Sequence, residues 1–227
     1  MKKTLLAVSL LALSAPAAAQ MSWSSWYAGF GAGQVKTDRE LVHNRETTIT
    51  NATGISTRFD DKDSSWKAFL GYRFNDWLGF EVSYSDLGEH STDTRFQGGD
   101  PPSDAQVIIR REVKGFGIDA VLSAPLTPAF SVFGKVGVFR ADMDASAQLG
   151  GNVVFTGSNE TFRSTNQREN VGHYGVGVDF HFARNLGARV EYERYTKVGK
   201  KFEVGGTGTT GEADMDNVSL SLVYRFR

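Results

Sequence analysis

The sequence predicts an all-β protein, an eight-stranded antiparallel up-and-down transmembrane β-barrel. Three observations favour this fold. Segments of about ten residues alternate apolar with small or charged residues, the pattern of strands that face lipid on one side and a polar interior on the other. The connections between these segments alternate between short and long. The chain has 25 glycines and no cysteine, and a closed barrel needs no disulfide because every strand edge is paired.

Residues 1–19 have the features of a signal peptide, which makes residues 20–227 the barrel domain. Lys2 and Lys3 form a basic start, residues 5–13 a mainly apolar core, and residues 17–19 a small-residue cleavage site. The apolar run is too short to cross a bilayer as a helix, which needs about 20 residues. An uncleaved anchor is the alternative. Without Lys2 and Lys3 the chain has 23 basic and 26 acidic residues, a balance that argues against nucleic-acid binding.

The first predicted strand covers residues 26–35, with glycines 29, 31 and 33 on its inner face. The hairpin of residues 67–88 follows, with a tight polar turn at residues 75–76. Its inner face carries Lys67, Phe69, Gly71, Arg73, Gly79, Glu81 and Ser83. Its outer face carries Ala68, Leu70, Tyr72, Phe74, Leu78, Phe80, Val82 and Tyr84. An apolar outer face and a small or charged inner face are typical of a transmembrane hairpin.

Five further strands repeat this design, each near the roughly 9–11 residues that a tilted strand needs to cross a membrane. They cover residues 113–122, 130–139, 173–182, 186–195 and 217–226. Their outward side chains are Phe116, Ile118, Ala120 and Leu122; Phe130, Val132, Val136 and Val138; Tyr174, Val176, Val178, Phe180 and Phe182; Leu186, Ala188, Val190 and Tyr192; and Val218, Leu220, Leu222, Tyr224 and Phe226.

The connections predict how the barrel is oriented. Short connections lie near residues 75–76, 125–128 and 184–185. Long connections cover residues 36–64, 86–106, 141–172 and 196–216. Short periplasmic turns and four long extracellular loops follow, with both termini in the periplasm. A soluble β-sandwich is the alternative, but eight apolar faces of similar length would overfill its core.

Aromatic residues near the strand ends are expected at the two membrane interfaces, which favour amphipathic rings. Tyr84 and Tyr192 are predicted toward the long loops, and the others toward the short turns. The whole set is Trp26, Tyr72, Phe74, Trp77, Tyr84, Phe180, Tyr192, Tyr224 and Phe226.

Short motifs over residues 24–227 resemble, in their order and spacing, the transmembrane domain of the outer membrane protein A type. They are Trp26-Tyr27-Ala28-Gly29, Gly71-Tyr72-Arg73-Phe74-Asn75, Gly79-Phe80-Glu81-Val82-Ser83-Tyr84, Arg140-Ala141-Asp142, Ala188-Arg189-Val190-Glu191-Tyr192 and Leu220-Ser221-Leu222-Val223-Tyr224-Arg225-Phe226. The motifs do not choose between the branches of this superfamily, which include opacity-type surface proteins.

The resemblance implies a barrel in the outer membrane of a Gram-negative bacterium, in contact with lipid and lipopolysaccharide. Full-length proteins of this type carry a periplasmic peptidoglycan-binding domain after the barrel, and no such domain is expected in this chain. Such barrels commonly end on an aromatic residue that the barrel-assembly machinery recognises, whereas here Phe226 is followed by Arg227. We expect a monomer.

Strand alternation predicts a network of charged side chains inside the barrel. Its members are Glu81, Lys135, Asp179, Arg189 and Glu191, with Lys67, Arg73 and Asp119 as further candidates. Side chains just fill an eight-stranded barrel, and buried charges must pair. The resemblance supports interior positions for Glu81 and Arg189. It also implies an interior lysine where this chain has Val121, a departure that argues against carrying over an ion-pair gate unless Lys135 substitutes as the partner.

Two functions remain open for this network. A static network would leave a plugged barrel with a structural and surface-interaction role, whose loops bind an unidentified surface ligand. A network that opens would make a small gated channel for small solutes.

An enzymatic function is not expected. His181 is followed two residues later by Ala183, so the serine of a barrel deacylase is missing, and His173 has no evident Ser-His-acid set. The acidic run at residues 60–63 lacks the glycine and terminal glutamate of a calcium loop. The sequence therefore predicts no catalytic residues, no metal site and no cofactor.

Overall fold

The computed structural model describes residues 26–37, 54–60, 62–97, 105–151, 160–199 and 213–226, which are almost entirely β-strand. The predicted signal peptide lies outside these residues. The strands are β1 (Trp26–Thr37), β2 (Gly54–Asp60), β3 (Lys62–Arg73), β4 (Leu78–Gln97), β5 (Ala105–Pro125), β6 (Phe130–Gly151), β7 (Phe162–His181), β8 (Leu186–Val198) and β9 (Ala213–Arg225). Within the described residues, no helix is long and apolar enough to cross a membrane.

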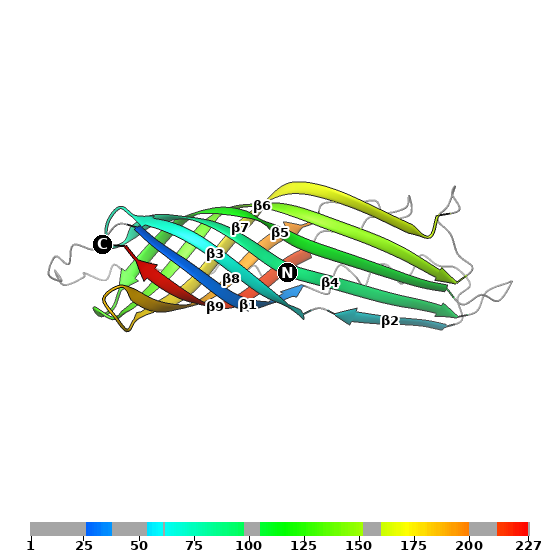
Figure 1. The fold of residues 1–227 in the computed structure, drawn as a ribbon, viewed down its shortest axis with the longest axis horizontal. Helices are drawn as coiled ribbons and strands as arrows, with labels where there is room; N and C mark the ends of the chain where they lie inside the picture. Colours follow the sequence, from blue (N-terminus) through cyan, green and yellow to red (C-terminus); the bar gives the residue numbers. More distant parts are fainter. Residues whose placement is uncertain are drawn as a thin grey trace, which may run out of the picture.

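The strands form one closed antiparallel barrel. Their order is β2-β4-β3-β1-β9-β8-β7-β6-β5, and pairing of β4 with β5 closes the sheet. Because β2 and β3 follow one another and both pair with β4, together they act as a single barrel strand. The barrel is therefore eight-stranded, which confirms the predicted fold class. Figure 1 shows the strands wound obliquely around the long axis, with the C-terminus at the left end.

Three short turns close this left end, which we call the turn end. In the first, the Asn75 side-chain oxygen accepts hydrogen bonds from the backbone N–H groups of Trp77 (3.0 Å) and Leu78 (2.7 Å). In the second, the Thr127 hydroxyl accepts from the N–H of Phe130 at 3.0 Å. Asn and Thr favour turns because their side chains can satisfy the backbone donors that a tight reversal leaves free.

The opposite end is uneven. Strands β4 to β7 have 20 to 22 residues, whereas β1, β8 and β9 have 12 or 13. The long strands therefore project on one side of the barrel, at the right of Figure 1. We call the projecting sheet of β2 and residues 89–97, 105–113, 141–151 and 162–171 the wall. The β5–β6 pairing runs through it without interruption, from Pro125–Ser131 to Ala105–Gly151.

The wall corrects the sequence prediction, because much of the predicted loops 86–106 and 141–172 is strand. The reason is the solvent on the outer face. Beyond the apolar belt, outward positions carry charged residues that lie opposite one another in the register, as in Lys114–Asp142 and Asp142–Arg168, and the second pair forms an ion pair at 2.9 Å. A strand with polar residues on its outer face lacks the apolar alternation on which the strand prediction depended.

A β-bulge marks where the wall leaves the barrel. The register between β4 and β5 shifts between Asp86 and Glu89. Gly88 within it has a φ of 78°, a left-handed conformation that favours glycine, and its N–H donates to the Asp86 carboxylate at 3.0 Å. At this point β4 changes partner from β3 to β2, since Trp66 pairs with Asp86 and Asp60 pairs with Ser91.

Around the barrel itself, outward side chains form an apolar belt. Phe30, Ile118, Val136 and Leu220 on four different strands are each 60–64% exposed. Such a belt belongs in hydrocarbon rather than water. Lumen positions, which alternate with the belt, are buried.

Candidate functional site

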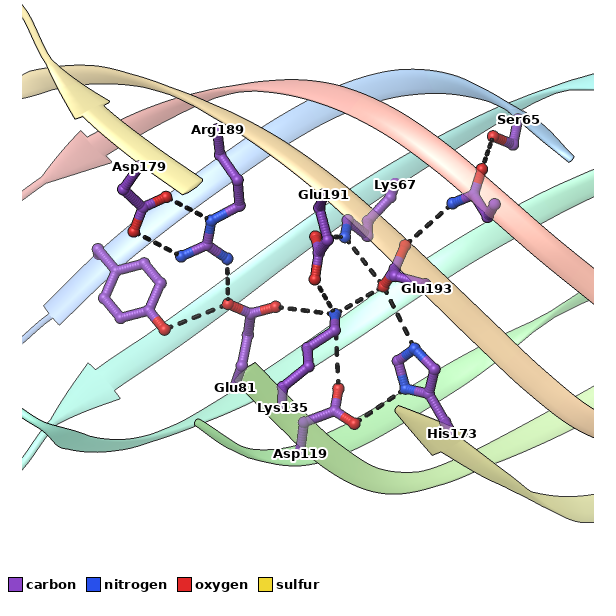
Figure 2. A network of polar contacts seen from close by, with 12 residues as sticks. Ser65, Lys67, Glu81, Asp119, Lys135, His173, Asp179, Arg189, Glu191 and Glu193 are labelled. Atoms are coloured by element: carbon purple, nitrogen blue, oxygen red, sulfur yellow. Dashed lines mark hydrogen bonds and ion pairs between the residues drawn. The ribbon is translucent and has the colours of Figure 1, made fainter. Parts of the chain in front are cut away.

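The barrel lumen holds the main concentration of buried charge among the described residues. Its fully buried ionisable side chains come from β3 to β8, one to three per strand, and all point inward because they occupy alternate positions. They are Lys67, Glu81, Asp119, Lys135, His173, Asp179, Arg189, Glu191 and Glu193. Figure 2 shows them as one network of contacts along the lumen.

Arg189 on β8 organises the part of the network nearest the turn end. Its guanidinium donates to both oxygens of Asp179, at 2.7 and 3.2 Å, and to the Glu81 carboxylate at 2.7 Å. Tyr27 donates its hydroxyl to the same Glu81 oxygen at 3.2 Å. Arg73 is 3.3 Å from Asp179 and partly exposed toward the turn end. The planar guanidinium suits this arrangement because it can serve two carboxylates at once.

Three aromatic rings surround the same guanidinium. Its central carbon lies 4.3 Å from the ring centre of Phe133, 4.8 Å from that of Phe69 and 5.5 Å from that of Tyr27. The negative faces of aromatic rings attract cations, more strongly where water is excluded. The cation is therefore held by carboxylates and by aromatic rings together.

Glycines on neighbouring strands make room for these rings. In the sheet register, Tyr27 lies opposite Gly71, Phe69 opposite Gly29, and Phe133 opposite Gly177. A Cβ atom on Gly71 would lie 2.1 Å from the Tyr27 ring, and one on Gly29 would lie 2.2 Å from the Phe69 ring. Both distances are far inside van der Waals contact. The inward glycines therefore leave the space that the large rings occupy in a narrow lumen.

Lys135 on β6 occupies the middle of the lumen. Its ammonium group lies 2.6 Å from Glu193 and 2.7 Å from Glu191, with Glu81 at 3.6 Å and Asp119 at 3.9 Å. Lys67 on β3 approaches the same two β8 glutamates, contacting Glu191 and lying 3.0 Å from Glu193. Lys67, Asp119, Lys135, His173, Glu191 and Glu193 form what we call the central cluster.

A chain of polar contacts extends the cluster toward β3 and β9. The Ser65 hydroxyl donates to the Asn217 side-chain oxygen at 2.7 Å, and the Asn217 amide donates to Glu193 at 2.9 Å. Buried polar groups without partners would be costly, so this chain helps to satisfy the charges that alternation places inside.

An apolar layer lies beside the central cluster, on its wall side. It consists of buried side chains from β1 and from β4 to β9. Phe139 packs edge-on against Tyr195 with ring centres 4.8 Å apart, and Tyr195 stacks on His173 at 4.4 Å. The layer is Val35, Leu87, Val113, Phe139, Ala141, Met143, Val171, Tyr195, Val198 and Met215, each at most 7% exposed.

The structure brings together all the interior charges named from the sequence. Val121, which stands where the resemblance implies a lysine, lies opposite Lys135 in the β5–β6 register. Sequence reasoning missed Glu193, although it continues the inward series of Arg189 and Glu191, and it did not find the role of His173. The signal for Glu193 was available in the alternation. The role of His173 had no such signal, because its partners Asp119 and Glu193 lie on other strands.

The predicted interface aromatics all point outward. Seven of them are 37–62% exposed, and Tyr72 and Tyr84 are half-buried by aromatic neighbours. Trp26 and Tyr72 have ring centres 4.9 Å apart, and Tyr84 and Phe116 have ring centres 4.8 Å apart. The set is Trp26, Tyr72, Phe74, Trp77, Tyr84, Phe180, Tyr192, Tyr224 and Phe226.

Polar groups just beyond the belt satisfy one another. Asp142 accepts hydrogen bonds from Asn166 (2.7 Å) and Arg168 (2.9 Å), and these donors hold the pKa of its carboxyl below the usual value. Within the described residues, no group of histidine and acidic side chains has an arrangement that could hold a metal ion.

Residues 5–226 match the model of the outer membrane protein β-barrel domain. The chain belongs to this family. Its surroundings are therefore the outer membrane of a Gram-negative bacterium, with lipid around the apolar belt.

Individual relatives are distant. Outer membrane protein A of Serratia marcescens is 27% identical over the whole chain and that of Yersinia pseudotuberculosis is 25% identical, and each match covers 56% of the relative. The chain thus spans just over half the length of these relatives. The attachment invasion locus protein Ail of Yersinia pestis aligns with 90% of this chain and 99% of its own, at 15% identity and a TM-score of 0.48.

Proposed function

We propose that this family member is a closed, non-enzymatic scaffold of the outer membrane with a plugged lumen, whose wall and adjoining connections present a surface for interaction outside the cell. The observation that carries this proposal is the stacking of two layers across the lumen. The ionic network lies in the half toward the turn end, and the apolar layer, contributed by seven strands, lies in the half toward the wall.

The two layers obstruct solutes for different physical reasons. Charges that are paired within the lumen are fixed by several contacts each, so an ion would have to break them to pass. Apart from the Tyr195 hydroxyl, the side chains of the apolar layer offer an entering ion no oxygen or nitrogen partner, so the ion would lose its hydration with little replacement. A small gated channel, the alternative function, would require both layers to open.

The rest of the proposal concerns biogenesis and surroundings. Residues 1–19 would direct export and be removed, and the barrel-assembly machinery would insert the monomeric chain. The turn end would face the periplasm and the wall would face outward, close to lipopolysaccharide. The surface ligand is unidentified.

Single-channel conductance of the refolded mature chain, residues 20–227, in a planar bilayer tests the plugged lumen. We expect no openings for the wild type or for Arg189→Ala, since the apolar layer remains in both. Folding is checked by the heat-dependent shift in gel mobility. Reproducible wild-type openings that Arg189→Ala alters would overturn the proposal in favour of the gated channel.

A further inference from the structure

His173 on β7 lies between two carboxylates from two other strands. Its Nδ1 atom is 2.9 Å from Asp119 Oδ1 on β5, and its Nε2 atom is 3.3 Å from Glu193 Oε1 on β8. All three side chains are completely buried. Figure 2 shows the ring between the two acids, with a dashed contact from each nitrogen.

This geometry constrains the protons on the ring. A neutral imidazole has one N–H donor and one nitrogen lone pair, whereas an ionised carboxylate can only accept. A neutral ring would therefore turn a lone pair toward one of the two carboxylates, in a place without water to separate them. Flipping the ring does not help, because both sides face an acid. Only the doubly protonated imidazolium offers a donor to each.

The charge balance of the central cluster also favours the doubly protonated form of His173. Glu81 lies closer to Arg189 (2.7 Å) than to Lys135 (3.6 Å), so it is counted with the arginine. The cluster then has two lysines against three acids, Asp119, Glu191 and Glu193. Within the central cluster, a neutral His173 leaves one more acid than cations, and a charge without a cation beside it is costly in a buried site. An imidazolium balances three positive charges against three negative ones.

We propose that His173 is a buried proton-binding site, and that its imidazolium is the third cation of the central cluster and clamps β7 to Asp119 and Glu193. The titratable and charged groups around it are Asp119 on β5, Lys135 on β6, and Glu193 and Tyr195 on β8. Tyr195 and Phe139 cover the ring on the wall side.

Binding of this proton makes the stability of the folded barrel depend on pH. The folded barrel holds a proton that a solvated histidine, with a pKa of about 6.5, has released at neutral pH, so stability falls as pH rises and the site empties. Loss of the proton leaves the cluster one charge negative and removes one of the two contacts that the His173 ring makes with Asp119 on β5 and Glu193 on β8.

A charge-balance experiment tests the proposal through unfolding in urea from lipid vesicles. We expect His173→Gln and Asp119→Asn each to raise the unfolding rate more than tenfold, because each leaves the cluster unbalanced by one charge. The double variant has two lysines and two acids, and we expect it to recover most of the loss. His181→Gln is the control, since that histidine lies near the turn end outside the central cluster.

The opposite pattern would overturn the proposal. If His173 is neutral, the wild type already has one negative charge too many, so Asp119→Asn alone would stabilise the barrel and His173→Gln would change little. A second measurement needs only the folded wild type: nitrogen-15 NMR of labelled histidines at pH 7.5, with the signal assigned from variants of the four histidines. Two protonated ring nitrogens on His173 support the proposal, and one protonated nitrogen refutes it.

Discussion

Replacing Arg189 by methionine tests whether the ionic network stabilises the barrel. The substitution keeps much of the volume and leaves Asp179 and Glu81 buried, each without its shortest contact. The three hydrogen bonds of the guanidinium have charged partners at both ends, and such bonds contribute about 1.5–3 kcal/mol each. Their simple sum, about 4.5–9 kcal/mol, is an upper bound because the bonds share one group.

Other cations in the lumen reduce the expected loss. Arg73 lies 3.3 Å from Asp179 and Lys135 lies 3.6 Å from Glu81, so both acids keep a partner. Removing one member of a buried ion pair typically costs about 3–5 kcal/mol. We therefore expect Arg189→Met to lower the free energy of unfolding by about 3 kcal/mol, which is about two powers of ten in the equilibrium constant.

The assay is reversible urea unfolding in lipid vesicles, followed by tryptophan fluorescence and by gel mobility. Arg189→Lys is the matched control: it keeps the positive charge, loses the planar fork, and should fall between the wild type and Arg189→Met. Removing the acids as well, in Arg189→Met with Asp179→Asn and Glu81→Gln, should restore much of the stability. A loss of under about 1 kcal/mol for Arg189→Met would refute this account of the network.

Three further predictions concern other parts of the structure. Gly71→Val should destabilise the barrel by more than about 1 kcal/mol in the urea assay, because its Cβ would lie 2.1 Å from the Tyr27 ring. Gly134→Ala should be nearly neutral, because its Cβ would meet only a backbone oxygen at 3.8 Å, and equal effects of the two substitutions would contradict the pairing of rings with glycines. Phe139→Ala empties a fully buried position in the apolar layer and should lower the unfolding free energy by about 3–5 kcal/mol, whereas no measurable change would mean that the layer is loosely packed. Because the chain has no cysteine, a single introduced cysteine can report which side of the membrane its position faces. In intact cells, a membrane-impermeant maleimide should label Asn166→Cys in the wall but not Asp76→Cys at the turn end. The reverse labelling pattern would show that the proposed orientation is inverted.

The belt and the lumen were predictable because alternation in a strand is local. An inward position two residues from another inward position stays inward whatever the partner strand is, so Glu81, Lys135 and Arg189 could be assigned to the lumen from the sequence. The tight turn at Asn75 was predictable for the same reason, since its hydrogen bonds close within three residues. The wall was not predictable in this way, because its outer face meets water and carries charge, as at Asp142 and Arg168.

By itself the sequence determined which side chains face lipid and which face the lumen, and therefore the fold class. Only the tertiary structure decided how the buried charges pair. Arg189 meets Glu81 across 108 residues of sequence, and His173 meets Asp119 across 54. Alternation puts these groups inside, but their height in the lumen depends on the register between strands and on the tilt set by barrel closure. Contacts at 2.7–2.9 Å depend on that height, so no pattern along a single strand can specify them.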